Sequence, residues 1–109
     1  MKNSEAIAAL SALANEHRLA VYRLLVQAGP EGLPAGALAD KLALPASSLS
    51  FHLAHLTRAG LIEQRRESRS LIYSADFTAM NGLVGFLTEN CCGGATCAPA
   101  AQPKKRKAS

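Results

Sequence analysis

Residues Pro45 to Tyr73 read PASSLSFHLAHLTRAGLIEQRRESRSLIY and change from a helical to a strand pattern partway along. The first half of this stretch carries leucines at positions 49, 53 and 56, which is the i, i+4, i+7 spacing of an amphipathic helix. Proline is well tolerated at the start of a helix and glycine commonly follows its end. We therefore predict a helix between Pro45 and Gly60, with its leucines facing a core.

The second half of this stretch changes from helical to strand periodicity. Leu61-Ile62 and Leu71-Ile72-Tyr73 are β-forming runs that flank the polar segment 64–70. Two such runs around a polar turn predict a β-hairpin with a charged tip. Ser68 stands at the turn, where glycine would fit more easily, so we expect a longer or looser tip than a two-residue turn.

Helical periodicity also predicts three helices before this stretch and one after it. Their expected ranges are about residues 4–14, 15–29, 33–42 and 76–90. Ser4 and Asn15 are the expected N-caps of the first two, because their side-chain oxygens can accept backbone N–H groups. The apolar positions expected to face the core are Ile7, Leu10, Leu13 and Ala14 in the first helix, and Phe77, Met80, Val84 and Leu87 in the last.

This order of elements gives a fold class that is mainly α with a small β-hairpin. The short connection at Ala43-Leu44 is typical of a helix-turn-helix motif. Residues 1–92 are the expected domain, and residues 93–109, which are mostly small and polar, are the expected flexible tail. A chain of 109 residues can bury a core, but with a modest margin that dimerisation would improve.

The charge and hydropathy patterns exclude some classes of protein and leave others open. The net charge of +4 comes from the run Lys104–Lys107, because the other 8 basic residues balance the 8 acidic ones. We expect this run to be a solvated tail that adds non-specific affinity for DNA. No run of 18 apolar residues is present and the N-terminus does not resemble a signal peptide, so we expect a cytoplasmic protein without a membrane partner.

The helix between Pro45 and Gly60 has an outward face suited to the DNA major groove. Short hydroxyl side chains let the backbone approach, while imidazole and guanidinium groups reach base edges and phosphates. Arginines on the hairpin would lie along the backbone or in the adjacent minor groove. Three alternatives stay open: the serines could be helix caps, the arginines could be a solvated turn, and His52, close to the leucine stripe, could be partly buried and structural. The predicted DNA-binding residues are Ser47, Ser48, Ser50, His52, His55, Arg58, Arg65, Arg66 and Arg69.

The cysteines cluster after the last predicted helix, as Cys91, Cys92 and Cys97. Three soft thiolates suit a thiol-seeking trivalent ion, arsenic(III) or antimony(III), better than zinc, which prefers four ligands. Gly93 and Gly94 permit the tight reversal that would bring Cys97 back to the pair. Three alternatives stay open: a redox switch through Cys97, a zinc site completed by another subunit or by water, and unrelated surface thiols.

The run from Ser47 to Ile62 resembles the recognition-helix signature of the ArsR/SmtB metalloregulators, with a Ser-x-His-Leu core followed by Leu and Ala-Gly-Leu. Residues 13–19 resemble the opening of the family's second helix, and residues 65–73 resemble its wing. The resemblance covers roughly residues 5–90 in collinear order. It implies a winged helix-turn-helix homodimer, paired through its first and last helices, that represses transcription from double-stranded operator DNA until an inducer binds.

The helix before the recognition helix departs from the best-known arsenic-responsive members of that family. They carry a Cys-Val-Cys motif there, whereas residues 33–39 contain no cysteine. The pair of adjacent cysteines with a third near the C-terminus resembles another branch, and Asp76 lacks the following histidine of a further family metal site. We predict a non-enzymatic repressor without a constitutive cofactor, which leaves DNA when Cys91, Cys92 and Cys97 bind arsenite or antimonite. A thiol-redox-responsive or zinc-responsive regulator is the alternative.

Overall fold

The leucine-spaced helix forms over Ala46–Arg58 (α4) in the computed structural model, which describes residues 1–94. Leu49, Leu53 and Leu56 are buried, as their spacing predicted. Pro45 is the N-cap, and the chain leaves the helix one residue before Gly60. The predicted bounds of this element are therefore confirmed.

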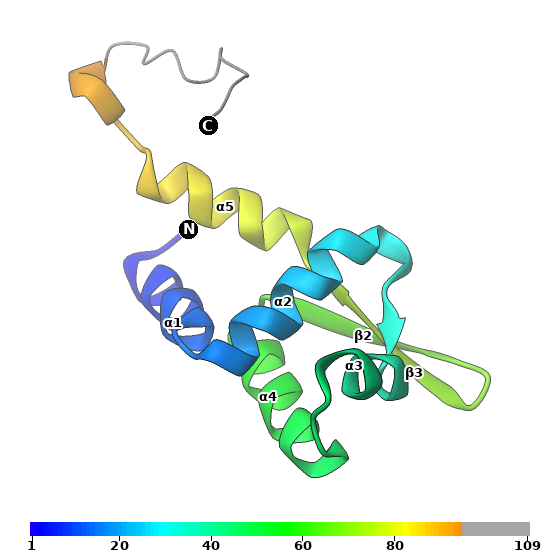
Figure 1. Cartoon of the computed structure of the whole chain (residues 1–109). Coiled ribbons are helices and arrows are strands. Elements are labelled where there is room, and N and C mark those ends of the chain that lie inside the picture. The colour runs from blue at the N-terminus through cyan, green and yellow to red at the C-terminus, as the bar shows by residue number, and fades with distance from the viewer. Residues whose placement is uncertain (95–109) are drawn as a thin grey trace.

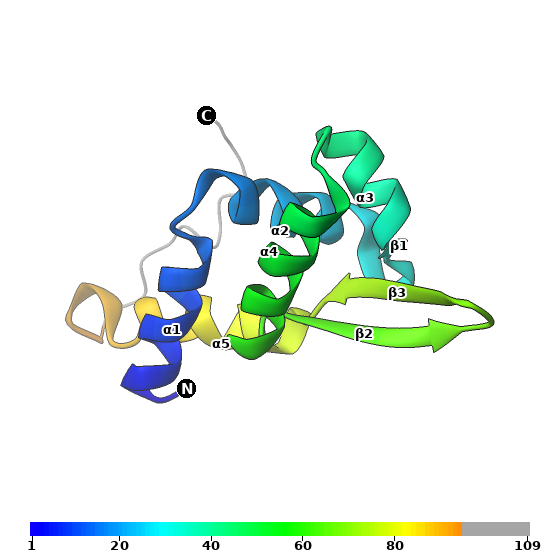
Figure 2. The ribbon, with the colours of Figure 1, turned by 90° about the horizontal axis from the view of Figure 1, so that it is seen from below.

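The other elements give a mainly helical domain with a small antiparallel sheet (Figure 1). In both views α4 lies between α1 (Asn3–Leu13) and the hairpin formed by β2 (Ile62–Glu67) and β3 (Ser70–Ala75), which projects away from the helices (Figure 2). None of the helices within residues 1–94 has the length and apolar character needed to span a bilayer. The elements are α1 (Asn3–Leu13), α2 (Glu16–Ala28), β1 (Leu33–Pro34), α3 (Ala35–Leu42), β2 (Ile62–Glu67), β3 (Ser70–Ala75) and α5 (Phe77–Leu87), with 3-10 turns η1 (Gly29–Glu31) and η2 (Cys91–Gly94).

α2, α3 and α4 pack around a common core that fixes the orientation of α4. Leu25 of α2, Leu38 of α3 and Leu56 of α4 are fully buried together. Ala43 reverses the chain between α3 and α4 with a φ of 53°, and the Leu44 N–H donates to the carbonyl of Ala39 at 3.1 Å. The short connection therefore forms the tight turn of a helix-turn-helix.

The sheet contains a third strand that the sequence did not predict. β1 pairs with β3, so that Leu33 lies opposite Tyr73 and Pro34 opposite Ile72. Pro34 is consequently a strand residue and the N-cap of α3, rather than part of its first turn. Gly32, directly before β1, has a φ of 70°, and a Cβ at this position would clash with the carbonyl oxygen of Tyr73. A strand of two residues is too short to show a periodic pattern, and its pairing partner β3 lies far away in the sequence, so no local signal predicted it.

The tip of the hairpin is tighter than we expected from the sequence. Glu67 pairs with Ser70, which leaves only Ser68 and Arg69 in the loop. Ser68 takes a φ of 57°, the left-handed conformation that such two-residue turns need. The prediction of a longer or looser tip was therefore wrong. The ladder between the two six-residue strands holds serine in a conformation that costs about 1–2 kcal/mol.

α1 turns alanines, not its large apolar side chains, toward the core. Ala6, Ala9 and Ala12 are buried, whereas Ile7 is 58% exposed and Leu10 is 43% exposed. The predicted inner face of this helix was therefore wrong for Ile7 and Leu10, whereas Leu13 packs against the core as predicted. Small side chains at the contact let α1 pack closely on α2 and α4, since the distance between helix axes depends on the residues between them.

Side chains cap the first turns of three helices. Asn15 accepts hydrogen bonds from two backbone N–H groups of α2, at 2.9 and 3.0 Å, as predicted. Asp76 accepts one from α5 at 3.0 Å. α1 begins at Asn3, and the carboxylate of Glu5 rather than the hydroxyl of Ser4 accepts the N–H before it, at 2.7 Å.

α5 is shorter and less buried than its periodicity predicted. It ends at Leu87 rather than near Asn90, and Leu83 is its one residue classed as buried. Val84 is 52% exposed and Leu87 is 57% exposed, so these two positions do not face the core of this chain. The reason is that α5 runs out past the helical core toward its C-terminal end (Figure 1).

Candidate nucleic-acid interface

α4 presents the predicted reading face to solvent. Ser47, Ser48 and Ser50 are exposed, and Phe51 is 62% exposed, while the leucines on the opposite side are buried. Pro45 is the N-cap, and no side chain caps the helix by a hydrogen bond. The alternative that these serines are helix caps was therefore wrong, and their hydroxyls face outward.

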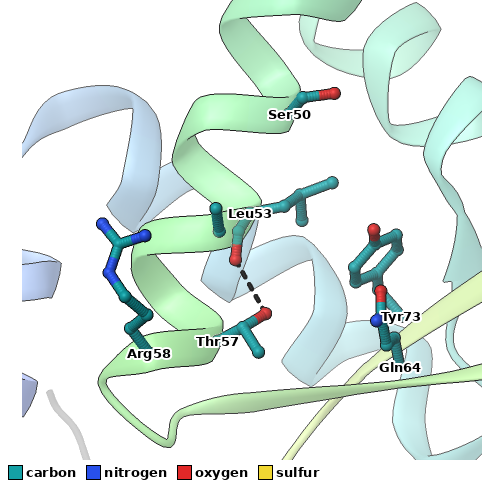
Figure 3. Close-up of a pocket in the computed structure, with 7 residues that line it drawn as sticks. Ser50, Leu53, Thr57, Arg58, Gln64 and Tyr73 are labelled. Atoms are coloured by element: carbon teal, nitrogen blue, oxygen red, sulfur yellow. Dashed lines mark hydrogen bonds between the residues drawn. The ribbon is translucent and has the colours of Figure 1, made fainter.

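A hollow of about 310 Å³ lies between α4 and the hairpin (Figure 3). Ser50 and Thr57 line it from α4, and Gln64 and Tyr73 line it from the hairpin, pointing toward the helix. The hydroxyl of Thr57 donates to the carbonyl of Leu53 at 2.8 Å, which leaves its lone pairs for other donors. The hollow thus combines hydroxyl and amide groups that can bind base edges or phosphates.

Sequence reasoning missed Gln64 and Tyr73 as candidate contact residues. They are directly paired across β2 and β3, so their side chains share one face of the sheet. The signal was present in the alternation of the hairpin, because residues at every second position share a face. It could be used only once the register of the two strands was known.

The two predicted histidines of α4 lie in different surroundings. His52 is half-buried, with its ring 5.5 Å from the ring of His17 on α2, and its Nδ1 is buried without a hydrogen-bond partner among residues 1–94. His55 lies beside Arg58, which is exposed and extends from the side of α4 opposite Gln64 (Figure 3). The ring of His52 therefore lies against α2 rather than fully outward, and a DNA contact by His52 stays a prediction.

The three arginines of the hairpin are not equivalent. Arg65 donates from Nε to the carboxylate of Glu67 and from a terminal nitrogen to the carbonyl of Glu31, both at 2.8 Å. A longer contact of 3.4 Å reaches the carbonyl of Pro30. These bonds attach the hairpin to η1, whereas Arg66 and Arg69 extend into solvent. A phosphate contact by any of the three stays a prediction.

Comparisons with known proteins agree with this geometry. A family model described as a helix-turn-helix domain matches residues 13–65. The chain is 37% identical over 87 residues to the transcriptional activator HlyU of Vibrio cholerae, and the match covers 79% of this chain and 78% of HlyU. Among solved structures, an ArsR-like transcriptional regulator from Rhodococcus sp. RHA1 superposes with a TM-score of 0.69 at 26% identity, covering 77% of this chain and 76% of that one.

The chain belongs to the ArsR-like family of winged helix-turn-helix transcriptional regulators. A homodimeric winged helix-turn-helix DNA-binding domain from Mycobacterium bovis has the same fold, with a TM-score of 0.65 at 24% identity over 86% of this chain and 87% of that one. In this regulator α3 and α4 are the helix-turn-helix that binds DNA, and the hairpin β2–β3 is the wing.

Protonation of His52 is expected to destabilise the regulator. The pKa of His52 lies below its ordinary value of 6.5, first because burial disfavours the cation, and then because Arg18, His17 and His55 are near. Below about pH 6.5 the unfolded chain therefore binds more protons than the folded chain, so the free energy of unfolding falls as the pH falls. Urea unfolding at about pH 7.5 and pH 5.5 should show this loss. The loss should shrink in His52→Gln, and an unchanged loss in that variant would contradict the assignment.

The cysteine cluster begins in η2, which three residues separate from the end of α5. Cys91 carries an exposed thiol whose sulfur lies 3.4 Å from the sulfur of Cys92. Cys97 and the basic run Lys104–Lys107 lie outside the described residues. Within residues 1–94 no group of three histidine, cysteine or acidic side chains is arranged to hold a metal ion. The three-cysteine site therefore stays a prediction.

Proposed function

We propose that this regulator is a homodimeric repressor that reads a two-fold symmetric site in double-stranded DNA with α4. The observation that carries the proposal is the exposed row of serine hydroxyls on α4, with Gln64 and Tyr73 of the wing beside it. Short hydroxyl side chains let a helix enter the major groove and bond to base edges. Arg66 and Arg69 are exposed on the wing, from which they would contact phosphates of the DNA backbone, and each such contact would release counterions.

The exposed apolar side chains of α1 and α5 support pairing of two copies. Ile7 and Leu10 on α1, and Val84 and Leu87 on α5, are all more than two-fifths exposed. Pairing through these helices would remove them from water and place two α4 helices about 34 Å apart, one turn of DNA. The related domain from Mycobacterium bovis is described as homodimeric.

Arsenic(III) or antimony(III) is the proposed inducer, bound by the thiolates of Cys91, Cys92 and Cys97. Two sulfurs that bind one ion at about 2.3 Å each, the length of a zinc–sulfur bond, can lie at most about 4.6 Å apart. The Cys91–Cys92 separation of 3.4 Å meets this limit. Capture of the ion requires the cysteines as thiolates, and the reducing cytoplasm, where we propose that the regulator acts, keeps thiols reduced.

A thiol-redox regulator is the second candidate function. The observation that favours it is the exposed thiol of Cys91, whose sulfur lies only 3.4 Å from that of Cys92. In this case formation and reduction of a disulfide, not the capture of an ion, would reorder the chain after α5. The same pair of neighbouring sulfurs supports both candidates, so an experiment has to distinguish ion capture from disulfide formation.

Arsenite is expected to weaken binding of the reduced protein to a duplex selected from a random library. The coupling between inducer and DNA should be about 5-fold to 150-fold in Kd, measured by fluorescence anisotropy. Cys92→Ser should stay bound, and native mass spectrometry should count arsenic in the wild type only. Equal release of both proteins would rule out the cysteine site, and release by peroxide alone would select the redox candidate.

A reporter gene tests whether the regulator represses or activates transcription. We expect the protein to silence the reporter and arsenite to restore its expression. Activation of the reporter by the protein would contradict the proposed repression.

A further inference from the structure

A second hollow flanks α4 on the side away from the wing. It lies between α1 and α4, has a volume of about 270 Å³ and is open to solvent. Ser11 and Ala8 line it from α1, and His55, Arg58 and Ala59 line it from the end of α4. In both overall views α1 runs beside this part of α4 (Figure 2).

Cationic groups gather around this hollow without a carboxylate to balance them. Arg58 reaches it from α4, and Arg18 of α2 lies close enough to act on His55. Arg18 is held in place by donating from Nε to the carbonyl of Ala12 at 2.7 Å. Burial lowers the pKa of His55, and the charges of Arg18 and Arg58 lower it further. No acidic side chain lines this hollow in the part of the chain that the structure describes, so its positive charge has no counter-ion from residues 1–94.

The geometry points to a binding site for a DNA backbone phosphate, held by the Ser11 hydroxyl, the His55 imidazole and the Arg58 guanidinium. This inference rests on the proposed DNA binding and adds a contact from α1, outside the helix-turn-helix and the wing. A duplex is the favoured source of the phosphate because α4, and Arg58 itself, line both this hollow and the one beside the wing.

A phosphate at this place changes the protonation of His55. In the free protein the neutral imidazole is favoured, whereas a bound phosphate stabilises the imidazolium through a charge-assisted hydrogen bond. Binding should therefore raise the pKa of His55 and take up a proton. The titratable or charged groups near His55 are Arg58 and His52 on the same helix and Arg18 on α2, and the two residues of α1 that line this hollow, Ala8 and Ser11, are neutral.

The test uses the full-length regulator and a fluorescein-labelled duplex of mixed sequence, because phosphate contacts need no operator. As the pH falls from the pKa of His55 in the complex toward its lower pKa in the free protein, Kd should fall by up to about tenfold per pH unit for each proton taken up. His55→Gln should remove this dependence, and NMR should show the pKa of His55 rising when the duplex is added.

Ser11→Ala should weaken binding by about tenfold, while the matched variant Ser4→Ala, on the same helix but outside the hollow, should bind as wild type. Arg58→Ala should lower the salt slope by about 0.9 per protomer.

Each other result overturns a stated part of the argument. A duplex that binds without moving the pKa of His55, together with wild-type affinity in Ser11→Ala, overturns the phosphate site and leaves the DNA-binding function intact. If inorganic phosphate at matched ionic strength raises that pKa and the duplex does not, the hollow is a site for small anions and the assignment to DNA is wrong. Failure of the wild type to bind any duplex overturns the proposed function itself.

Discussion

Ser50→Glu is expected to weaken binding of the selected duplex on the order of 30-fold to 10,000-fold, without unfolding the regulator. Ser50 is exposed in the middle of α4 and lines the hollow between α4 and the wing. A glutamate there replaces a short donor with a longer anion that faces the DNA phosphates. Each reading helix would lose about 1–3 kcal/mol, and a dimer loses this twice. Anisotropy titrations at fixed salt concentration measure the change in Kd.

The matched control for this substitution is Gln27→Glu on α2. Gln27 is also exposed, and the change adds the same charge away from α4. We expect this variant to bind within about threefold of wild type, since surface charges away from an interface contribute little. Circular dichroism and urea unfolding should give the same fold for all three proteins. Comparable losses in both variants would mean that net charge, not the face of α4, sets the affinity.

The double variant Val84→Glu/Leu87→Glu is expected to be monomeric and to bind DNA about 100-fold to 10,000-fold more weakly. Both side chains are more than half exposed on α5, so glutamates are tolerated in the single chain. In the proposed dimer they would place unpaired charges in an apolar interface, at a cost of several kcal/mol per charge. A monomer carries one reading helix and therefore loses the avidity of two. Sedimentation velocity gives the mass, and anisotropy gives the affinity.

Leu19→Glu/Val26→Glu provides the control for the dimer prediction. These residues are 43% and 39% exposed on α2, so the variant adds the same charges and removes similar apolar surface. It should remain dimeric, because α2 does not belong to the proposed interface. A monomer from the α2 variant with a dimer from the α5 variant would move the interface to α2. Dimers from both variants would leave neither helix as the contact.

Local pattern was enough to predict most of the elements near α4. The leucines at positions 49, 53 and 56 gave the helix and its buried face, and Pro45 and Gly60 gave its limits. Asn15 was correctly placed as the cap of α2. Each of these features depends on residues within four or five positions of one another, and hydrogen-bond geometry over that range is almost independent of the rest of the fold.

The prediction of buried side chains failed in the two helices that are apolar on more than one side, α1 and α5. Periodicity showed that α1 and α5 are apolar, but not which apolar side chains each helix would bury. In α1 the alanines took the core positions and left Ile7 and Leu10 in solvent, and α5 likewise left Val84 and Leu87 exposed. A helix apolar on more than one side can satisfy several packings, and the distance to its neighbours decides among them.

Neighbouring residues were enough to predict α4, the hairpin, the likeness to ArsR/SmtB regulators and the grouping of the cysteines, because each of these features depends on a short run of the chain. Folding was needed to place Gln64 and Tyr73 beside α4, to bond Arg65 to η1, and to bring Ser11 into one hollow with His55 and Arg58. These groupings join segments far apart along the chain, through contacts within a few ångströms. Packing of the whole core sets such distances, and no local spacing of residues encodes them.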